Sequence, residues 1–218
     1  MVLRWSETDI VLLDLDGTVF DLAFDNYLWR LEVPRQAARR LGVGSETLAE
    51  VIESARCERP DLSYYSVEHW SQTFSDDIVQ VHRELRHLVM YRNGSLQFLR
   101  FSRECRKQVM IVSNAHPHAL AVKDEMLGFT REVDATHSAF DIGSTKQHFD
   151  FWRILGKREG LDPRRTVLVD DSLPVVACAQ EWGMGRVFLV DQPDMTLPPQ
   201  CASVPTVRFL PELMQSMA

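Results

Sequence analysis

The sequence predicts an α/β fold, in which a parallel sheet is covered by helices and an all-helical segment is inserted after the first strand. From residue 93 onward, short apolar runs alternate with segments of helical periodicity. This alternation is typical of βαβ units around a sheet that is buried on both faces. Residues 21 to 92, in contrast, show helical periodicity alone and contain no lysine. The 218 residues provide room for one sizeable domain, or for a core of about 140 residues with a smaller inserted unit.

The first predicted strand carries the most informative residues. Residues 10–13 are all apolar, and Asp14, Asp16 and Gly17 follow within four positions. If the strand continued, the two carboxylates would lie on the same face, and Gly17 would then allow the backbone to turn away. Paired carboxylates at a buried strand end are costly unless a cation or substrate compensates their charge. The alternative is that Asp-Gly is only a turn signal after an apolar strand.

The remaining elements follow from periodicity and from glycine and proline positions. Helices are predicted within the insert at residues 25–41, 46–57, 67–74 and 76–90. After it, helices are predicted at 95–106, 118–127, 147–158, 173–182 and 210–217, and strands at 109–112, 133–137, 166–169 and 185–190. Pro193, Pro198 and Pro199 predict an irregular segment before the last helix.

Composition excludes several classes of protein. The 31 acidic and 24 basic side chains give a net charge of −7, which disfavours binding to nucleic acid or to anionic lipid. The four cysteines are widely separated and form no Cys-x-x-Cys pair, so neither a zinc site nor a disulfide scaffold is indicated. The first apolar run is too short for a secretory signal, and no segment is long enough to span a membrane. We therefore expect a cytoplasmic location and leave the oligomeric state open.

Polar residues gather where the predicted strands end. Asp14 and Asp16 follow the first strand, and Lys146 precedes a helix. The others are Ser113 and Asn114 after the second strand, and Asp170, Asp171 and Ser172 after the fourth. Each has an ordinary explanation, as a helix N-cap, a strand-end hydroxyl or a solvated charge. Ligands of open α/β sheets bind beyond the carboxyl ends of the strands, so the conjunction predicts one shared site.

These residues carry a family resemblance. The order Asp-x-Asp-Gly-Thr, strand-Ser-Asn, isolated Lys and strand-Asp-Asp-Ser resembles the four signatures of the haloacid dehalogenase (HAD) superfamily. This resemblance implies an HAD-like Rossmannoid three-layer parallel-sheet core, built from residues 1–20 and 93–218, and an inserted helical cap at 21–92. Residues 12–27 and 113–123 are similar more narrowly to the bacterial GMP/IMP 5′-nucleotidase family.

The resemblance also implies a mechanism. Asp14 would be the nucleophile that forms an aspartyl-phosphate, and Asp16 would protonate the leaving oxygen and later accept a proton from water. Mg²⁺ would be held by Asp14, Asp170 and the main-chain carbonyl of Asp16, with Asp171 orienting Lys146 or a water beside the metal. The phosphate would be bound by Ser113, Asn114, Lys146 and the backbone around Gly17 and Thr18.

Substrate selection would fall to residues near the cap. Asn26 and Tyr27 follow the nucleophile closely, and His116 and His118 follow Ser113, so these four are the first candidates for substrate contacts. Several insert aromatics could stack on a purine, namely Tyr27, Trp29, Tyr64, Tyr65 and Trp70. Aromatic residues at helical spacing are, however, more often part of a core.

The expected function is a Mg²⁺-dependent phosphomonoester hydrolase, a 5′-nucleotidase acting on the purine monophosphates GMP and IMP. One alternative is an HAD phosphatase or mutase for sugar phosphates or other small phosphomonoesters, which would share every core residue and differ only in the cap. Another is a non-catalytic binding subunit that keeps the fold. Phosphonate cleavage in this superfamily uses a cap lysine, so the lysine-free insert argues against it.

Overall fold

The computed structural model describes residues 3–58 and 61–215, and within them it contains a six-stranded parallel sheet. The strand order is β3-β2-β1-β4-β5-β6, with every neighbouring pair parallel. The strands are β1 (Ile10–Leu13), β2 (Gln108–Ser113), β3 (Ala135–Ser138), β4 (Thr166–Asp170), β5 (Arg186–Val190) and β6 (Thr206–Val207). The predicted parallel α/β class is confirmed, and β1 lies in the middle of the sheet.

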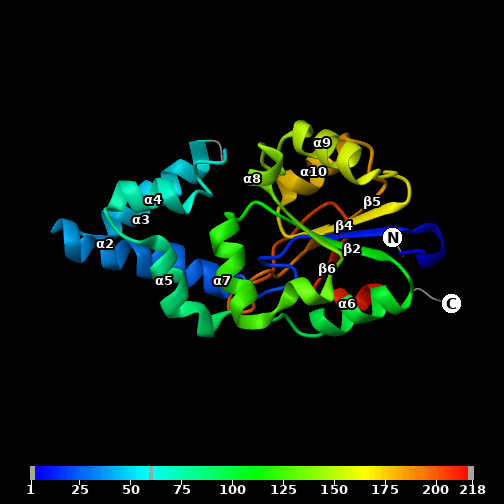
Figure 1. Cartoon of the computed structure of the whole chain (residues 1–218), viewed down its shortest axis with the longest axis horizontal. Coiled ribbons are helices and arrows are strands. Elements are labelled where there is room, and N and C mark those ends of the chain that lie inside the picture. The colour runs from blue at the N-terminus through cyan, green and yellow to red at the C-terminus, as the bar shows by residue number, and fades with distance from the viewer. Residues whose placement is uncertain (1–2, 59–60, 216–218) are drawn as a thin grey trace.

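Helices cover both faces of this sheet, which makes three layers (Figure 1). Because successive strand side chains point to opposite faces, Val11 and Leu13 enter one apolar core and Ile10 and Leu12 the other. The first core is completed by α6 (Ser95–Glu104), α7 (Pro117–Leu127) and the 3₁₀ segment Leu210–Gln215. The second is completed by α8 (Ala139–Ile142), α9 (Phe149–Glu159) and α10 (Leu173–Glu181).

The helical insert lies beside one end of the sheet (Figure 1). It consists of α1 (Ala23–Tyr27), a π-helical turn (Leu28–Glu32), α2 (Val33–Leu41), α3 (Ser45–Glu58), α4 (Val67–Phe74) and α5 (Ile78–Leu85), followed by a 3₁₀ turn (Arg86–Leu88). Its apolar side chains, among them Leu28, Trp70 and Phe74, are continuous with the core under the sheet. The division into a core of residues 1–20 and 93–218 and a cap of residues 21–92 stays a prediction.

The two chain segments that join the insert to the sheet are hydrogen-bonded to each other. The amide of Asp21 donates to the Met90 carbonyl at 3.0 Å, and the amide of Arg92 donates to the Val19 carbonyl at 2.9 Å. Phe20 and Tyr91 form an antiparallel bridge between these bonds. This pairing explains why the helix predicted at 76–90 does not reach residue 90. The helix α5 ends at Leu85, the 3₁₀ turn Arg86–Leu88 follows, and Val89 is extended.

Other differences from the sequence-based prediction concern short elements. The helix predicted at 25–41 begins at residue 23 and contains the π-helical turn, and the strand predicted at 133–137 is found at 135–138. Neither α8 nor β6 was predicted, because four and two residues are too few to show a period. The final predicted helix is the 3₁₀ segment Leu210–Gln215, and residues 216–217 of that prediction lie outside the described residues.

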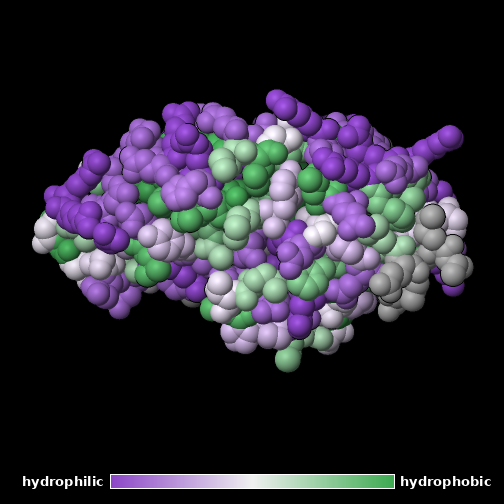
Figure 2. Space-filling model, turned by 90° about the horizontal axis from the view of Figure 1, so that it is seen from below, coloured by the Kyte–Doolittle hydropathy of each residue, from purple (hydrophilic) through white to green (hydrophobic). Residues whose placement is uncertain are grey.

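One face of the molecule carries both hydrophilic and hydrophobic residues. Seen from below, hydrophilic residues cover much of the face, and hydrophobic ones gather over its middle (Figure 2). Among residues 3–58 and 61–215, the structure contains no helix with the length and apolar character needed to cross a bilayer.

We expect Arg92 to contribute strongly to stability. It is 3 % exposed, and its guanidinium donates to the Pro193 carbonyl at 2.6 Å and to the Arg208 carbonyl at 2.7 Å. Arg92→Met would leave the Arg208 carbonyl without its donor and the Pro193 carbonyl with the Leu22 amide alone, so the free energy of unfolding should fall by about 2–4 kcal/mol in urea titrations. The control is Arg103→Met, because Arg103 also donates to a carbonyl but is exposed, and it should change stability by less than about 0.5 kcal/mol. Equal effects of the two substitutions would contradict this account.

Candidate active site

The candidate site begins where β1 and β4 end side by side. Leu13 pairs with Val169 in the register of these strands, and the amide of Asp14 donates to the Val169 carbonyl at 3.0 Å. Asp14 and Asp170 therefore emerge next to each other at the carboxyl edge of the sheet. In this strand order the connections leave β1 and β4 in opposite directions, and the gap between them is the place where open α/β sheets bind ligands.

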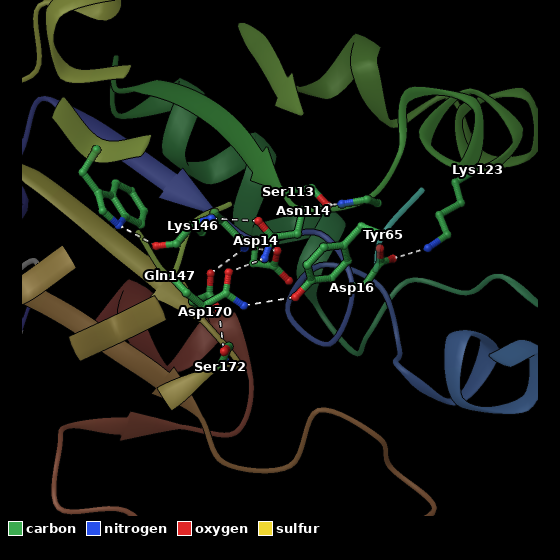
Figure 3. A network of polar contacts seen from close by, with 12 residues as sticks. Asp14, Asp16, Tyr65, Ser113, Asn114, Lys123, Lys146, Gln147, Asp170 and Ser172 are labelled. Carbon is green, nitrogen blue, oxygen red and sulfur yellow. Dashed lines mark hydrogen bonds and ion pairs between the residues drawn. The ribbon is translucent and has the colours of Figure 1, made fainter. Parts of the chain in front are cut away.

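Lys146 joins the two carboxylates (Figure 3). Its ammonium hydrogen-bonds to Oδ1 of Asp14 and, at 2.7 Å, to Oδ2 of Asp170. The lysine is held from behind, since its amide donates to Oδ1 of Asn114 at 2.9 Å and its carbonyl accepts from Nε1 of Trp152 at 2.8 Å. Lys146 comes from a loop more than a hundred residues after Asp14, and these buried contacts fix where its charge lies.

The site carries more negative than positive charge. One cavity is lined by four carboxylates, those of Asp14, Asp16, Asp170 and Asp171. Among the described residues that line it, Lys146 is the one lysine. Burial raises the pKa of Asp14 well above its usual value, against the opposing effect of the Lys146 ammonium. Burial, and then the charge of Asp170, raises the pKa of Asp171 to about 7. For Lys146 burial lowers the pKa, but Asp14 and Asp170 outweigh it and the net pKa is raised.

This charge balance fits a bound cation. The carboxylates of Asp14, Asp170 and Asp171 repel one another, and the Lys146 ammonium offsets only part of their charge, so they form the donor set that a hard divalent cation prefers. Asp170 is oriented for such a role, because its Oδ1 accepts the amide of Ser172 at 2.9 Å while its Oδ2 faces Lys146. We infer that Asp14 and Asp170 can hold the cation, with Asp171 beside them.

Two of the predicted phosphate-binding residues lie at the end of β2. Ser113 is 2 % exposed, and its hydroxyl accepts the amide of Ala115 at 3.0 Å, so its hydrogen remains available for a ligand in the cavity. The amide group of Asn114 is used instead on the loop of Lys146, because Nδ2 donates to Oε1 of Gln147 at 2.9 Å. Asn114 therefore positions Lys146 in addition to lining the cavity.

Gly17 and Thr18 shape the loop after β1. Gly17 has φ +91°, and a Cβ at this position would lie 2.5 Å from Oδ2 of Asp171 and 2.9 Å from Cβ of Pro193. Any side chain here would therefore displace a carboxylate of the site. Thr18 is 1 % exposed, and its hydroxyl has no hydrogen-bond partner within the described part of the chain. Neither residue is among the described residues that line the cavity.

A cavity of about 240 Å³ extends from these carboxylates to the helical insert. Its insert side carries aromatic and imidazole side chains, namely Trp29, Tyr64, Tyr65, Trp70 and His82. Of the four residues predicted to contact substrate, Asn26 and His116 line the cavity. Tyr27 and His118 are not among its described lining residues, and both are exposed.

Polar contacts that the sequence did not predict connect the insert to the core around this cavity. The Tyr65 hydroxyl accepts from Nε2 of Gln147 at 3.0 Å. Asn26 donates to Oδ2 of Asp194 at 2.7 Å. Such contacts cannot be predicted from the sequence, because the periodicity of a segment does not indicate which residue of a distant segment lies opposite it.

Glu68 on α4 contacts two histidines at the start of α7, His116 at its N-cap and His118 in its first turn. Nε2 of His116 lies 2.9 Å from one Glu68 oxygen, and Nδ1 of His118 lies 3.1 Å from the other. Nδ1 of His116 accepts the amide of His118 at 3.2 Å, which assigns the proton of the neutral ring to Nε2, facing Glu68. Burial lowers the pKa of His116. We interpret these three residues as a contact between insert and core.

A second buried lysine, Lys123, contacts the site from the other side (Figure 3). Its ammonium donates to Oδ1 of Asp16 at 2.6 Å and to both carboxylate oxygens of Asp25 at 2.9 Å. Burial, and then the charge of Asp16, raises the pKa of Asp25 to about 7, although Lys123 opposes the rise. Lys123 was not predicted as a site residue. Its sequence signals were the resemblance of residues 113–123 to the nucleotidase family and its place after the apolar residues 119–122.

Comparison with known proteins identifies the class. The family model of haloacid dehalogenase-like hydrolases matches residues 8–181, and the chain belongs to this family of hydrolases, as an enzyme of its phosphatase type. The chain is 34% identical over 196 residues to the GMP/IMP nucleotidase YrfG of Escherichia coli strain K12, covering 88% of this chain and 87% of that protein. The protein of the same name from Shigella flexneri matches to the same extent.

Solved structures show the same fold. A HAD phosphatase from Thermococcus onnurineus superimposes with a TM-score of 0.77 and 20% identity, over 95% of this chain and 97% of that one. A putative beta-phosphoglucomutase from Thermotoga maritima gives 0.68 and 17% identity over the same shares of the two chains. The predicted superfamily and its nucleotidase-like branch are thus confirmed as the relatives of this chain.

The buried histidine of the insert should make stability depend on pH. His82 is 1 % exposed, its Nδ1 bonds the Ile78 carbonyl at 2.8 Å, and burial lowers its pKa to about 4. Below pH 6.5 the unfolded chain binds this proton and the folded one does not, so stability should fall between about pH 6.5 and 4. The loss from this one group should reach roughly 3 kcal/mol.

The measurement is urea unfolding at several pH values in EDTA, for the wild type and for His82→Asn, whose amide can still donate to the carbonyl. The variant should lose less stability than the wild type over this range. The control is His87→Asn, because His87 also bonds a carbonyl, that of Glu84 at 3.1 Å, but is exposed. Parallel pH profiles for wild type and His82→Asn would show that His82 is not the titrating group.

Proposed function

We propose that the protein is a Mg²⁺-dependent 5′-nucleotidase that removes the phosphate of purine monophosphates, GMP and IMP, through an aspartyl-phosphate on Asp14. The observation that carries the proposal is the cluster of Asp14, Lys146 and Asp170 at the base of a cavity whose other side is aromatic. The 34% identity to a GMP/IMP nucleotidase supports the choice of substrate.

The first step is capture of the phosphoryl group. A carboxylate oxygen of Asp14 attacks phosphorus, and the bond from phosphorus to the ribose 5′ oxygen breaks. The Lys146 ammonium, already bonded to Asp14, is placed to bind a phosphoryl oxygen, as is the Ser113 hydroxyl. Asp16 lines the same cavity and gives its proton to the departing oxygen, which leaves as the nucleoside hydroxyl.

The second step releases phosphate. Asp16, now ionised, accepts a proton from a water that attacks the phosphorus of the aspartyl-phosphate. The bond between phosphorus and the Asp14 oxygen breaks, the carboxylate is restored, and inorganic phosphate leaves. Asp16 ends the cycle protonated, as it began.

The carboxylates of Asp14 and Asp170 and the main-chain carbonyl of Asp16 are the proposed Mg²⁺ ligands, with Asp171 beside them. When bound, the ion neutralises charge on the phosphoryl oxygens and on these carboxylates. The surplus of buried acidic groups over lysine supports this assignment, because a like-charged pair 4 Å apart costs about 4 kcal/mol at an effective dielectric constant of 20.

The insert side of the cavity suits a purine. Trp29, Tyr64 and Tyr65 are half-buried and line the cavity, so part of each ring is open to a stacked base. Trp70 is 2 % exposed and stacks on Phe74 at 5.4 Å between centroids, which assigns it to the core of the insert. Asn26 and His116 lie on the cavity wall and are the proposed contacts for the ribose.

Phosphate release from a panel of monophosphates tests the substrate. With Mg²⁺, we expect kcat/KM for IMP and GMP to exceed that for CMP, UMP and hexose phosphates by at least roughly tenfold, and EDTA to abolish turnover. Higher activity on hexose phosphates, or their isomerisation without net phosphate release, would favour a sugar-phosphate enzyme. Equal, undetectable release from the whole panel would refute the nucleotidase.

The nucleophile is tested by Asp14→Asn. Turnover should fall by at least about 10³-fold, since the attacking carboxylate is lost. The variant should still fold, because removing one carboxylate relieves repulsion within the site. Asp150→Asn, which changes an exposed carboxyl of α9, serves as the control and should keep full activity. Near wild-type turnover in folded Asp14→Asn would mean that the chain does not use this residue for covalent catalysis.

A further inference from the structure

Lys123 is a buried charge that the proposed reaction does not use. Its side chain is 1 % exposed and extends from α7 between two carboxylates. The neighbouring positions of the helix, among them Ala119, Leu120 and Val122, are buried and apolar. A buried ammonium is costly unless it is paired, so its position has to be explained by its partners.

The partners of Lys123 satisfy its ammonium completely. The three contacts, one to Asp16 at 2.6 Å and two to Asp25 at 2.9 Å, match the three hydrogens of the group. The ammonium also lies 5.4 Å from the centroid of the Phe24 ring. Asp16 belongs to the loop after β1, whereas Asp25 lies in α1, the first helix of the insert. One lysine thus fixes the proposed acid relative to both the core and the insert.

We propose that Lys123, supported by Asp25, is a positioning residue that holds the Asp16 carboxyl in the orientation needed to protonate the leaving oxygen. This inference rests on the proposed role of Asp16, but not on the identity of the nucleoside. Lys146 serves Asp14 and Asp170 in the same way on the other side of the site. A misplacement of about 1 Å in a catalytic group can reduce the rate about 10²-fold, so removal of Lys123 should be visible in kinetics.

A series of aryl phosphates separates positioning from a structural tether. p-Nitrophenolate leaves without help from an acid, whereas phenol leaves far better when it is protonated. The ratio of kcat/KM for phenyl phosphate to that for p-nitrophenyl phosphate therefore reports on the acid alone. The value of kcat/KM covers only the steps up to capture of the phosphoryl group. The later step, in which Asp16 accepts a proton from the attacking water, therefore does not affect it. Neither ester contains a nucleobase, so selectivity among nucleotides does not affect the ratio either.

We expect Lys123→Met to lower kcat/KM for phenyl phosphate on the order of 10²-fold and that for p-nitrophenyl phosphate less than about fivefold. Asp16→Asn should show the same pattern more strongly. Asp25→Asn, which is close to isosteric, should shift the ratio in the same direction by about three- to tenfold and covers the case in which Lys123→Met does not fold. The control is Lys157→Met, an exposed lysine of α9, which should leave both values unchanged.

Equal losses of kcat/KM on both esters in Lys123→Met would overturn the proposal, because a contact that only holds helices together would affect both leaving groups alike. A wild-type ratio of the two kcat/KM values in folded Asp25→Asn would also overturn it. Turnover of both esters by the wild type without turnover of nucleotides would refute the nucleotidase and leave the role of Lys123 standing. Absence of turnover on both esters and on every monophosphate of the nucleotide panel would refute both.

Discussion

The contact of the Lys146 ammonium with Asp14 and Asp170 is the interaction on which the rest of the site depends. Two carboxylates at the ends of adjacent buried strands would repel each other, and the lysine allows them to remain side by side. Several buried contacts serve to hold this lysine, including the Asn114 side chain and the Trp152 indole. The sheet supplies the carboxylates, and the loop before α9 supplies the charge that makes their proximity tolerable.

The helical insert contributes in two ways. It supplies the aromatic wall of the cavity, and it is connected to the core by polar contacts at the edge of that cavity, such as Tyr65 with Gln147. The contact of Asp25 with Lys123 links the first helix of the insert to Asp16 itself. In this arrangement the position of the insert and the position of the proposed acid are physically coupled, so the segment proposed to contact the substrate also helps to hold the proposed acid in place.

The sequence was sufficient for the framework because the framework is encoded locally. Short apolar runs, such as residues 10–13, and segments of helical periodicity predicted the parallel sheet and the helical insert. The polar residues at the strand ends predicted which side chains the structure brings together. The partners of Lys123 and Tyr65 could not be predicted, because they lie about a hundred residues away in the chain and their contacts follow no period. The π-helical turn at Leu28–Glu32 and the early end of α5 likewise depend on tertiary packing that propensity does not contain.

The central claim is that Asp14 captures the phosphoryl group, and its most direct test is to trap that intermediate. Enzyme mixed with radiolabelled monophosphate and quenched in acid within milliseconds should carry label on the peptide that contains Asp14, in an amount that rises before phosphate is released and disappears as turnover ends. Release of phosphate with no protein-bound label at any time, or label on another residue, would contradict the account.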